Sequence, residues 1–190
     1  LLEAINSGAD VVTANKALLA THGPVIFDAA DQVGAQVYYE ASVAGAIPII
    51  RPLRDSLAGD RVQRIMGIVN GTTNFILDKM DAEHLTLEAA GLAFHTTVPL
   101  EAVHREGITE IDKSMIDAAR KAGYVVKLLA VCERLLEAGE EAISVRVYPA
   151  LVDRKHPLAS VHGANNAVFV QAEAAGDLMF YGAGAGGIQT

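Results

Sequence analysis

The chain has little cysteine, no basic excess and no long apolar run, and each shortage excludes a class of protein. Its 190 residues include one cysteine, Cys132, so an internal disulfide is impossible and a thiolate metal centre has no support. The net charge of −8, with no basic run or aromatic platform, argues against a nucleic-acid partner. No apolar stretch approaches the ~18 residues of a membrane span. We therefore expect no nucleic-acid or membrane partner, and the cysteine usage fits a cytoplasmic location.

What remains is a chain with enough apolar residues for a solid core. Hydrophobic residues make up 51% of the sequence and charged residues 20%, which excludes disorder. Cys132 ends the strand-like run at 126–132, and we interpret it as a buried, inert thiol. None of the six histidines pairs at the spacing of metal ligands on a helix. We interpret the acidic cluster of Glu133, Glu137, Glu140 and Glu141 as a solvated face and turn.

The order of apolar patterns predicts an α/β fold. Strand and helix patterns alternate first, and strand pairs follow, which favours a mixed β-sheet with helices on one face and an antiparallel part. We expect Pro24 and Ser114 to open helices, Pro52 to kink one, and Ala174 to Gly176 to form a hairpin turn. The predicted helices are 1–8, 24–33, 47–57, 73–80, 87–95 and 114–122, and the predicted strands are 10–14, 36–40, 61–69, 124–135, 143–148, 166–173 and 177–181.

Two segments within 40 residues have the form of ligand-binding turns. In both 38–48 and 67–74, a short apolar run leads into small and hydroxyl residues and then into a helical pattern. Ligands of open α/β sheets sit just beyond the carboxyl ends of strands, where loops supply free backbone groups. Helix capping and turn formation would also explain residues 70–74 of the second segment. The many polar groups there slightly favour ligand binding.

Two charged residues and a glycine run are further candidates, each with a plainer alternative. Lys16 directly follows a predicted buried strand, so its ammonium could hold an anion or a developing alkoxide, or it could be a solvated surface lysine. Glu40 lies among apolar residues before a turn rich in carbonyl groups, which suits Na⁺, K⁺ or Ca²⁺; it could equally cap a helix or form a salt bridge. The run at 182–187 could cradle a phosphate or be a flexible tail.

Taken together, six segments resemble homoserine dehydrogenase, and the resemblance looks closest to actinobacterial members. The segments occur in the family's order and cover nearly the whole chain. They are GADVVTANKALLATHG (8–23), YYEASVAGAIPIIRPLRDSLAGDRV (38–62), RIMGIVNGTTNFILDKM (64–80), LAFHTTVPLEAVHREGITEI (92–111), HPLASVHGANNAVFVQAE (156–173) and MFYGAGAGG (179–187).

The resemblance implies an NAD- or NADP-dependent enzyme that interconverts L-homoserine and L-aspartate 4-semialdehyde as a homodimer or homotetramer. It implies a remnant of a Rossmann domain at 1–38, a substrate and dimerisation domain at 39–181, and a cofactor loop at 182–190. Lys16 matches the family's catalytic lysine, and Gly71 and Thr72 match its substrate turn. Cofactor contacts fall on Thr13, Lys16, Gly184, Ala185 and Gly186, and a Na⁺ or K⁺ site, mostly of backbone carbonyls, falls on Glu40, Val43, Gly45 and Ile47.

The chain also departs from the family's pattern. The family's first glycine-rich loop and a segment expected between Met80 and Leu92 have no counterpart, and no lysine occurs between Lys79 and Lys113, where the family carries its proton-transfer lysine. Two interpretations follow: a piece of a longer enzyme, or a catalytically silent dimerisation module of the same fold. We expect the first, because the flanking segments are intact.

Overall fold

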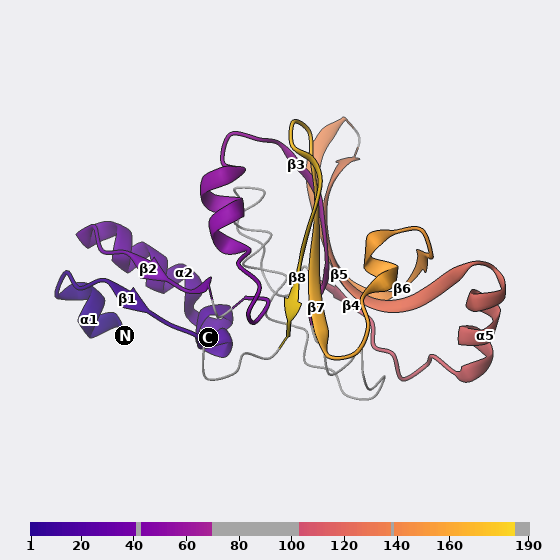
Figure 1. The fold of residues 1–190 in the computed structure, drawn as a ribbon. Helices are drawn as coiled ribbons and strands as arrows, with labels where there is room; N and C mark the ends of the chain where they lie inside the picture. Colours follow the sequence, from indigo (N-terminus) through magenta and orange to yellow (C-terminus); the bar gives the residue numbers. More distant parts are fainter. Residues whose placement is uncertain (41–42, 70–102, 138, 185–190) are drawn as a thin grey trace.

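A computed structural model describes residues 1–40, 43–69, 103–137 and 139–184. Among these residues, six strands form one sheet in the order β4-β6-β5-β3-β7-β8 (Figure 1). The parallel pairing of β4 with β6 and the antiparallel pairing of the rest make the sheet mixed, which confirms the predicted α/β class. The strands are β3 (Val62–Ile68), β4 (His104–Arg105), β5 (Tyr124–Glu137), β6 (Glu140–Asp153), β7 (Asn165–Ala172) and β8 (Gly176–Ala183).

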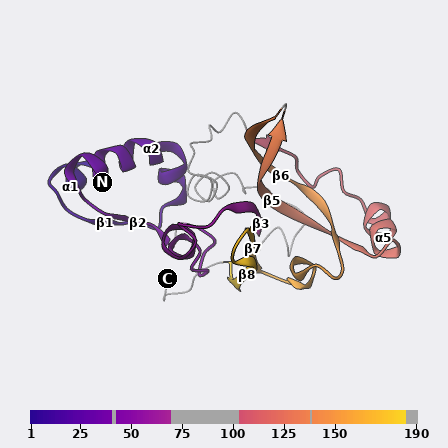
Figure 2. The ribbon, with the colours of Figure 1, turned by 90° about the horizontal axis from the view of Figure 1, so that it is seen from above.

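A smaller unit precedes the sheet and lies at one end of the molecule (Figures 1 and 2). It consists of α1 (Leu2–Asn6), β1 (Val11–Val12), α2 (Lys16–Val33) and β2 (Val37–Tyr38). β1 and β2 pair in parallel with α2 between them, the arrangement of a βαβ unit. The predicted burial of β1 is right for Val11 and wrong for Val12, which is 82% exposed because the two-stranded sheet is covered on one face. No helix in the described ranges has the length and apolar character needed to cross a membrane.

Two predicted helix starts are wrong. α2 begins at Lys16 rather than Pro24, because the Asn15 side chain caps it by accepting a hydrogen bond from the Leu18 amide at 3.0 Å. Pro24 lies inside this helix, where it removes one N–H donor without ending the helix. α5 (Lys113–Lys121) is capped by Asp112 rather than Ser114, whose hydroxyl donates to the Asp112 carboxylate at 2.7 Å. The predicted helices at 73–80 and 87–95 lie outside the described residues.

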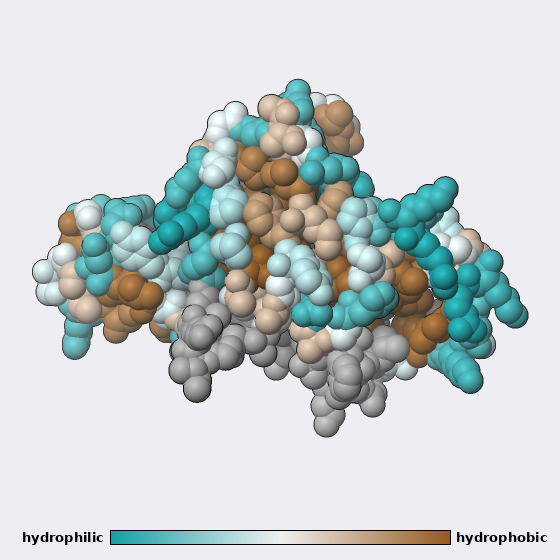
Figure 3. Space-filling model, in the orientation of Figure 1, coloured by the Kyte–Doolittle hydropathy of each residue, from teal (hydrophilic) through white to brown (hydrophobic). Residues whose placement is uncertain are grey.

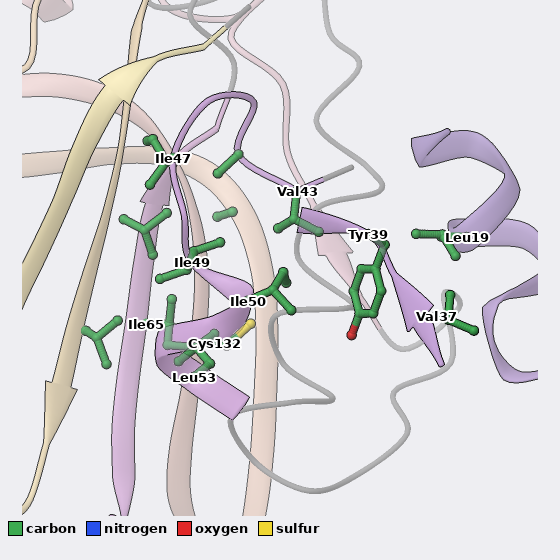
Figure 4. Close-up of a cluster of buried hydrophobic side chains, with 14 of the residues drawn as sticks. Leu19, Val37, Tyr39, Val43, Ile47, Ile49, Ile50, Leu53, Ile65 and Cys132 are labelled. Atoms are coloured by element: carbon green, nitrogen blue, oxygen red, sulfur yellow. The ribbon is translucent and has the colours of Figure 1, made fainter. Parts of the chain in front are cut away.

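The helix predicted at 47–57 is shorter and changes its winding at Pro52. Its first helical residue is Ile50, and residues Pro52–Ser56 form the π-helix η2. The predicted kink therefore appears as a change in the hydrogen-bond pattern, since proline supplies no amide donor. Ile49, just before the helix, and Ile50 and Leu53 within it are buried against the sheet (Figure 4).

The first face of the sheet carries the larger core. Ile65, Cys132 and Val170 from the sheet belong to one cluster with Leu53 and with Leu19 of α2 (Figure 4). Cys132 is buried and forms no disulfide, and burial raises the pKa of its thiol to about 12. The predicted burial of the thiol is confirmed, and the raised pKa favours the protonated form over the reactive thiolate.

The described residues cover only part of the second face. The 3₁₀ helix η4 (Pro157–Ser160) packs there, and Leu158 joins a cluster with Leu129 and Phe169. Beside it is a hollow of about 250 Å³ that contains Glu133. The prediction that Glu133 belongs to a solvated cluster is wrong: it is buried and forms salt bridges to Arg64, at 2.6 Å, and to Arg146. These two guanidinium groups make burial of the carboxylate possible.

Candidate functional site

The exits of β3 and β8 and the segment 43–47 meet at one end of the sheet. β7 runs antiparallel to both of its neighbours, so the ends of β3 and β8 lie beside its beginning. The register pairs Ile68 with Ala167, and Ala183 with Asn165. The end of β3, which precedes 70–74 in the sequence, therefore lies at the same end of the sheet as the end of β8. The third segment, 43–47, packs against the end of β8.

Glycine allows this third contact. The amide of Ala46 donates to the carbonyl of Ala183 at 3.2 Å, which joins the two segments. Gly45 has a φ of 66°, and a Cβ atom there would overlap the carbonyl group of Gly184. Gly184 in turn has no room for a Cβ atom, because the side chain of Asn166 and the carbonyl oxygen of Ala164 lie against it. The backbones of the two segments therefore pack directly against each other, because both segments consist of small residues at the contact.

Asn166 lies at the centre of this contact, and the sequence analysis did not select it. It is fully buried. Its Nδ2 group donates to the carbonyl oxygen of Val69, at the end of β3, at 3.2 Å. No donor in the described part of the chain reaches its Oδ1 atom. The signal in the sequence was weak: an asparagine pair at the start of an apolar strand also fits a simple turn.

The structure shows that Glu40 caps a helix, as one of the alternatives predicted. Its Oε1 atom accepts the amide of Ile50 at 2.7 Å, and its Oε2 atom accepts the amide of Arg51 at 3.1 Å. These are the first amides of the helix, which carry its positive end. Because the carboxylate is engaged in this way, a cation would depend on backbone carbonyls of the segment. Val43 and Ile47 are buried in the core, which fixes the path of that segment.

Lys16 and Thr13 lie where β1 leads into α2. The amide of Thr13 donates to the carbonyl of Tyr38 at 2.8 Å, and its hydroxyl accepts the amide of Asn15 at 3.2 Å. Lys16 is the first residue of α2, so it follows a parallel strand at its carboxyl end. The other predicted site residues, Gly71, Thr72, Ala185 and Gly186, lie outside the described residues.

Comparison with known proteins points to one family. A family model for homoserine dehydrogenase matches residues 48–90 and 89–190. A homoserine dehydrogenase of Corynebacterium glutamicum is 49% identical over all of this chain and 50% of its own length. A crystal structure of the enzyme from Thiobacillus denitrificans has a TM-score of 0.90 at 36% identity, covering 97% of this chain and 49% of its own. A hyperthermophilic archaeal homoserine dehydrogenase mutant in complex with NADPH has a TM-score of 0.77 at 25% identity, covering 98% and 61%.

The alignments also locate a difference from these relatives. The chain spans about half the length of the C. glutamicum protein, and their alignment extends over 222 positions, more than the 190 residues of this chain. The relative therefore has residues inside the aligned region that this chain lacks. The two family matches meet at 89–90, within the stretch where the sequence analysis expected a missing segment. With matches over residues 48–190 and this agreement in fold, the chain belongs to the homoserine dehydrogenase family.

Proposed function

We propose that the protein carrying this chain interconverts L-homoserine and L-aspartate 4-semialdehyde with NAD or NADP. The reaction serves threonine, methionine and isoleucine biosynthesis. The observation that supports the proposal is the meeting of Gly45, Gly184 and Val69 at one end of the sheet, where the described parts of three predicted ligand segments lie together. Such an end, with small residues and free backbone groups, is where α/β proteins bind small ligands.

The proposed roles follow the positions of the residues. A bound nicotinamide would accept hydride from the hydroxyl-bearing carbon of homoserine, while the hydroxyl proton leaves to a base. Lys16 would stabilise the developing alkoxide with its ammonium. Thr13, Lys16, Gly184, Ala185 and Gly186 would contact the cofactor, in line with the NADPH bound by the archaeal relative. Gly71 and Thr72 would contact the substrate.

The segment Glu40 to Ile47 fits a monovalent cation better than a transition metal. In the described structure, no hydrogen bond ends on the carbonyl oxygens of Val43, Gly45 or Ile47, whereas the Glu40 carbonyl accepts the amide of Val43 at 3.2 Å. Neutral carbonyl oxygens are ligands for hard cations. We propose Na⁺ or K⁺, held by the carbonyls of Glu40, Val43, Gly45 and Ile47.

The domain limits, assembly and location belong to the same proposal. The parallel β1–β2 pair supports a nucleotide-domain remnant at 1–38, and the six-stranded sheet supports a substrate and dimerisation domain at 39–181. Residues 182–190 would return to the cofactor. We propose a cytoplasmic homodimer or homotetramer, with small molecules as its ligands.

Turnover by the full-length protein tests this function directly. We expect L-homoserine to drive reduction of NAD or NADP, and Lys16→Ala to lower kcat by about 100-fold or more, because an ion that stabilises the alkoxide is lost. Lys113→Ala is the matched control, since Lys113 is also the first residue of a helix, α5, and should leave kcat unchanged. Absence of homoserine-dependent reduction in the wild type would refute the function. An unchanged kcat with a raised cofactor KM would make Lys16 a binding residue.

A silent dimerisation module is the second candidate, and the comparisons do not favour it. Its only support is the internal segment that this chain lacks relative to the relatives. Intact-mass spectrometry of the purified protein separates the two. A mass near 20.0 kDa would favour the module, and a mass roughly twice as large, as the half-length coverage of the relatives implies, would favour the enzyme.

A further inference from the structure

Asn166 has a buried polar group that fold stability alone does not explain. It is fully buried at the start of β7, and the next residues on the same face, Val168 and Val170, are apolar. Its Oδ1 atom has no hydrogen-bond donor among the described residues. A buried polar atom without a partner costs about 1–3 kcal/mol, so an apolar side chain of similar size would suit this position better as core. The role of the carboxamide therefore depends on the groups that it contacts.

The carboxamide lies between the ends of two strands. Its Nδ2 group holds the carbonyl of Val69 at 3.2 Å, one residue before the segment Asn70 to Asn74 begins. Its oxygen lies against Gly184, whose amide donates to the carbonyl of Ala164 at 3.3 Å. Gly184 is also the residue against which Gly45 packs. One side chain thus sets the distance between the exit of β3, the exit of β8 and the proposed cation segment.

We propose that Asn166 is a positioning residue that fixes the spacing between the exit of β3 at Val69 and the exit of β8 at Gly184, which lead in sequence into the proposed substrate turn and cofactor turn. This inference rests on the proposed function of the two turns. Hydride transfer requires substrate and nicotinamide to approach closely in one orientation, and a displacement of about 1 Å can cost about 100-fold in rate. The residue does not touch the reacting atoms, so it acts through the backbone of Val69 and Gly184.

The test compares Asn166→Leu with the wild type in the full-length protein. Leucine has nearly the same size, removes the donor to Val69 and also removes the unpartnered oxygen. We expect little change in the melting temperature, because the lost hydrogen bond to Val69 and the lost unpartnered oxygen act in opposite directions, and we expect kcat to fall about tenfold to 100-fold, more than either KM rises. Asn165→Ala is the matched control: Asn165 begins the same strand, but its side chain donates to the carbonyl of His162 at 3.0 Å, within its own turn, so kcat should not change.

The outcomes separate this inference from the proposed function. A wild type without homoserine-dependent turnover would refute the function, and this inference with it. An active wild type whose kcat is unaffected by Asn166→Leu would overturn the inference alone, as would a loss of stability that accounts for the loss of activity. If the leucine variant does not fold, Asn166→Ser, whose hydroxyl is too short to reach Val69, is judged by the same comparison of kcat with KM.

Discussion

At the scale of single residues, the site depends on glycines that allow backbone groups to touch. Gly45 combines a φ of 66° with the carbonyl of Gly184 in the place of its missing Cβ atom. Gly34, at the end of α2, has nearly the same φ, 71°, and open space around its Cα atom. Alanine substitutions at the two positions therefore separate the free-energy cost of the left-handed backbone conformation from the cost of placing a Cβ atom against a neighbouring segment.

Alanine at these two glycines should have different effects on stability. We expect Gly34→Ala to lower the free energy of unfolding by about 1–2 kcal/mol, the cost of a left-handed conformation. Gly45→Ala should cost more, because its Cβ atom must also push the end of β8 away. Chemical denaturation of both variants measures the difference. Equal losses would show that the end of β8 moves aside freely, and that the contact between the segments is loose.

Variants of Glu40 distinguish the helix cap from the cation site. Glu40→Ala removes the acceptors of the Ile50 and Arg51 amides, so we expect a loss of about 1 kcal/mol in the free energy of unfolding. Glu40→Gln keeps one acceptor oxygen and the backbone carbonyl. Activity of this variant should still depend on Na⁺ or K⁺ and tolerate EDTA, because the proposed ligands are backbone atoms. A loss of monovalent dependence in Glu40→Gln would place the carboxylate itself among the ligands.

The sequence predicted part of this chemistry, and the missing part has a physical reason. Helix capping by Glu40 was foreseen as an alternative because a carboxylate among apolar residues needs partners. Asn166 was not foreseen, because its role depends on Val69, which is 97 residues away in the chain. Only the pairing of β3 with β7 brings them together, and no local pattern encodes that pairing.

At the scale of elements, the carboxylate of Asp60 links the turn of the β7–β8 hairpin to the start of β3 by hydrogen bonds. Asp60, just before β3, accepts the amides of Ala174 and Ala175 at 2.9 and 2.8 Å, from the hairpin turn. These two backbone hydrogen bonds are the largest causes that lower the pKa of the Asp60 carboxyl below its ordinary value. A lowered pKa means that the charged form stabilises the folded state above the ordinary pKa.

Asp60→Asn should therefore destabilise the protein in a pH-dependent way. The amide keeps one acceptor and replaces the other with a donor, so the variant should melt at a lower temperature than the wild type at neutral pH. The difference should shrink as the pH falls below about 4, the ordinary value, through the lower folded pKa, because the wild-type carboxylate is then protonated. Asp177→Asn, on the same hairpin but bonded only to the side chain of Gln171, is the control. A difference in melting temperature that is independent of pH would refute the role of the charge.

Elements that are bounded by clear turn residues were predicted best. The β7–β8 hairpin follows the prediction closely, because Gly176, with a φ of 73°, lies at the turn between two clear strand patterns. β5 and β6 are longer than predicted, because they pair along their whole length, from Tyr124 with Asp153 to Glu137 with Glu140. Tertiary pairing of this kind overrides local propensity.

At the scale of the whole molecule, the two faces of the sheet are covered unequally. Among the described residues, η2 and the segment before it cover the first face, whereas η4 covers only part of the second. Met66, Leu129 and Val131 line the hollow on the second face together with Arg64 and Arg146. Hydrophobic side chains also gather over the β7–β8 edge of the sheet (Figure 3). A surface of this kind, apolar with a few charged groups, is typical of protein interfaces.

We expect the second face to form the contact of the homodimer that the family resemblance implies. Pairing two sheets across a two-fold axis would bury roughly 800 Å² from each partner, enough for a stable dimer. Leu151 lines the hollow and is 63% exposed, so Leu151→Asp should turn the dimer into a monomer at micromolar concentration. Leu136→Asp is the control, because Leu136 is 77% exposed near the β5–β6 turn and does not line the hollow. Light scattering gives the answer: a wild-type monomer, or a dimer that Leu151→Asp leaves intact, would place the contact elsewhere.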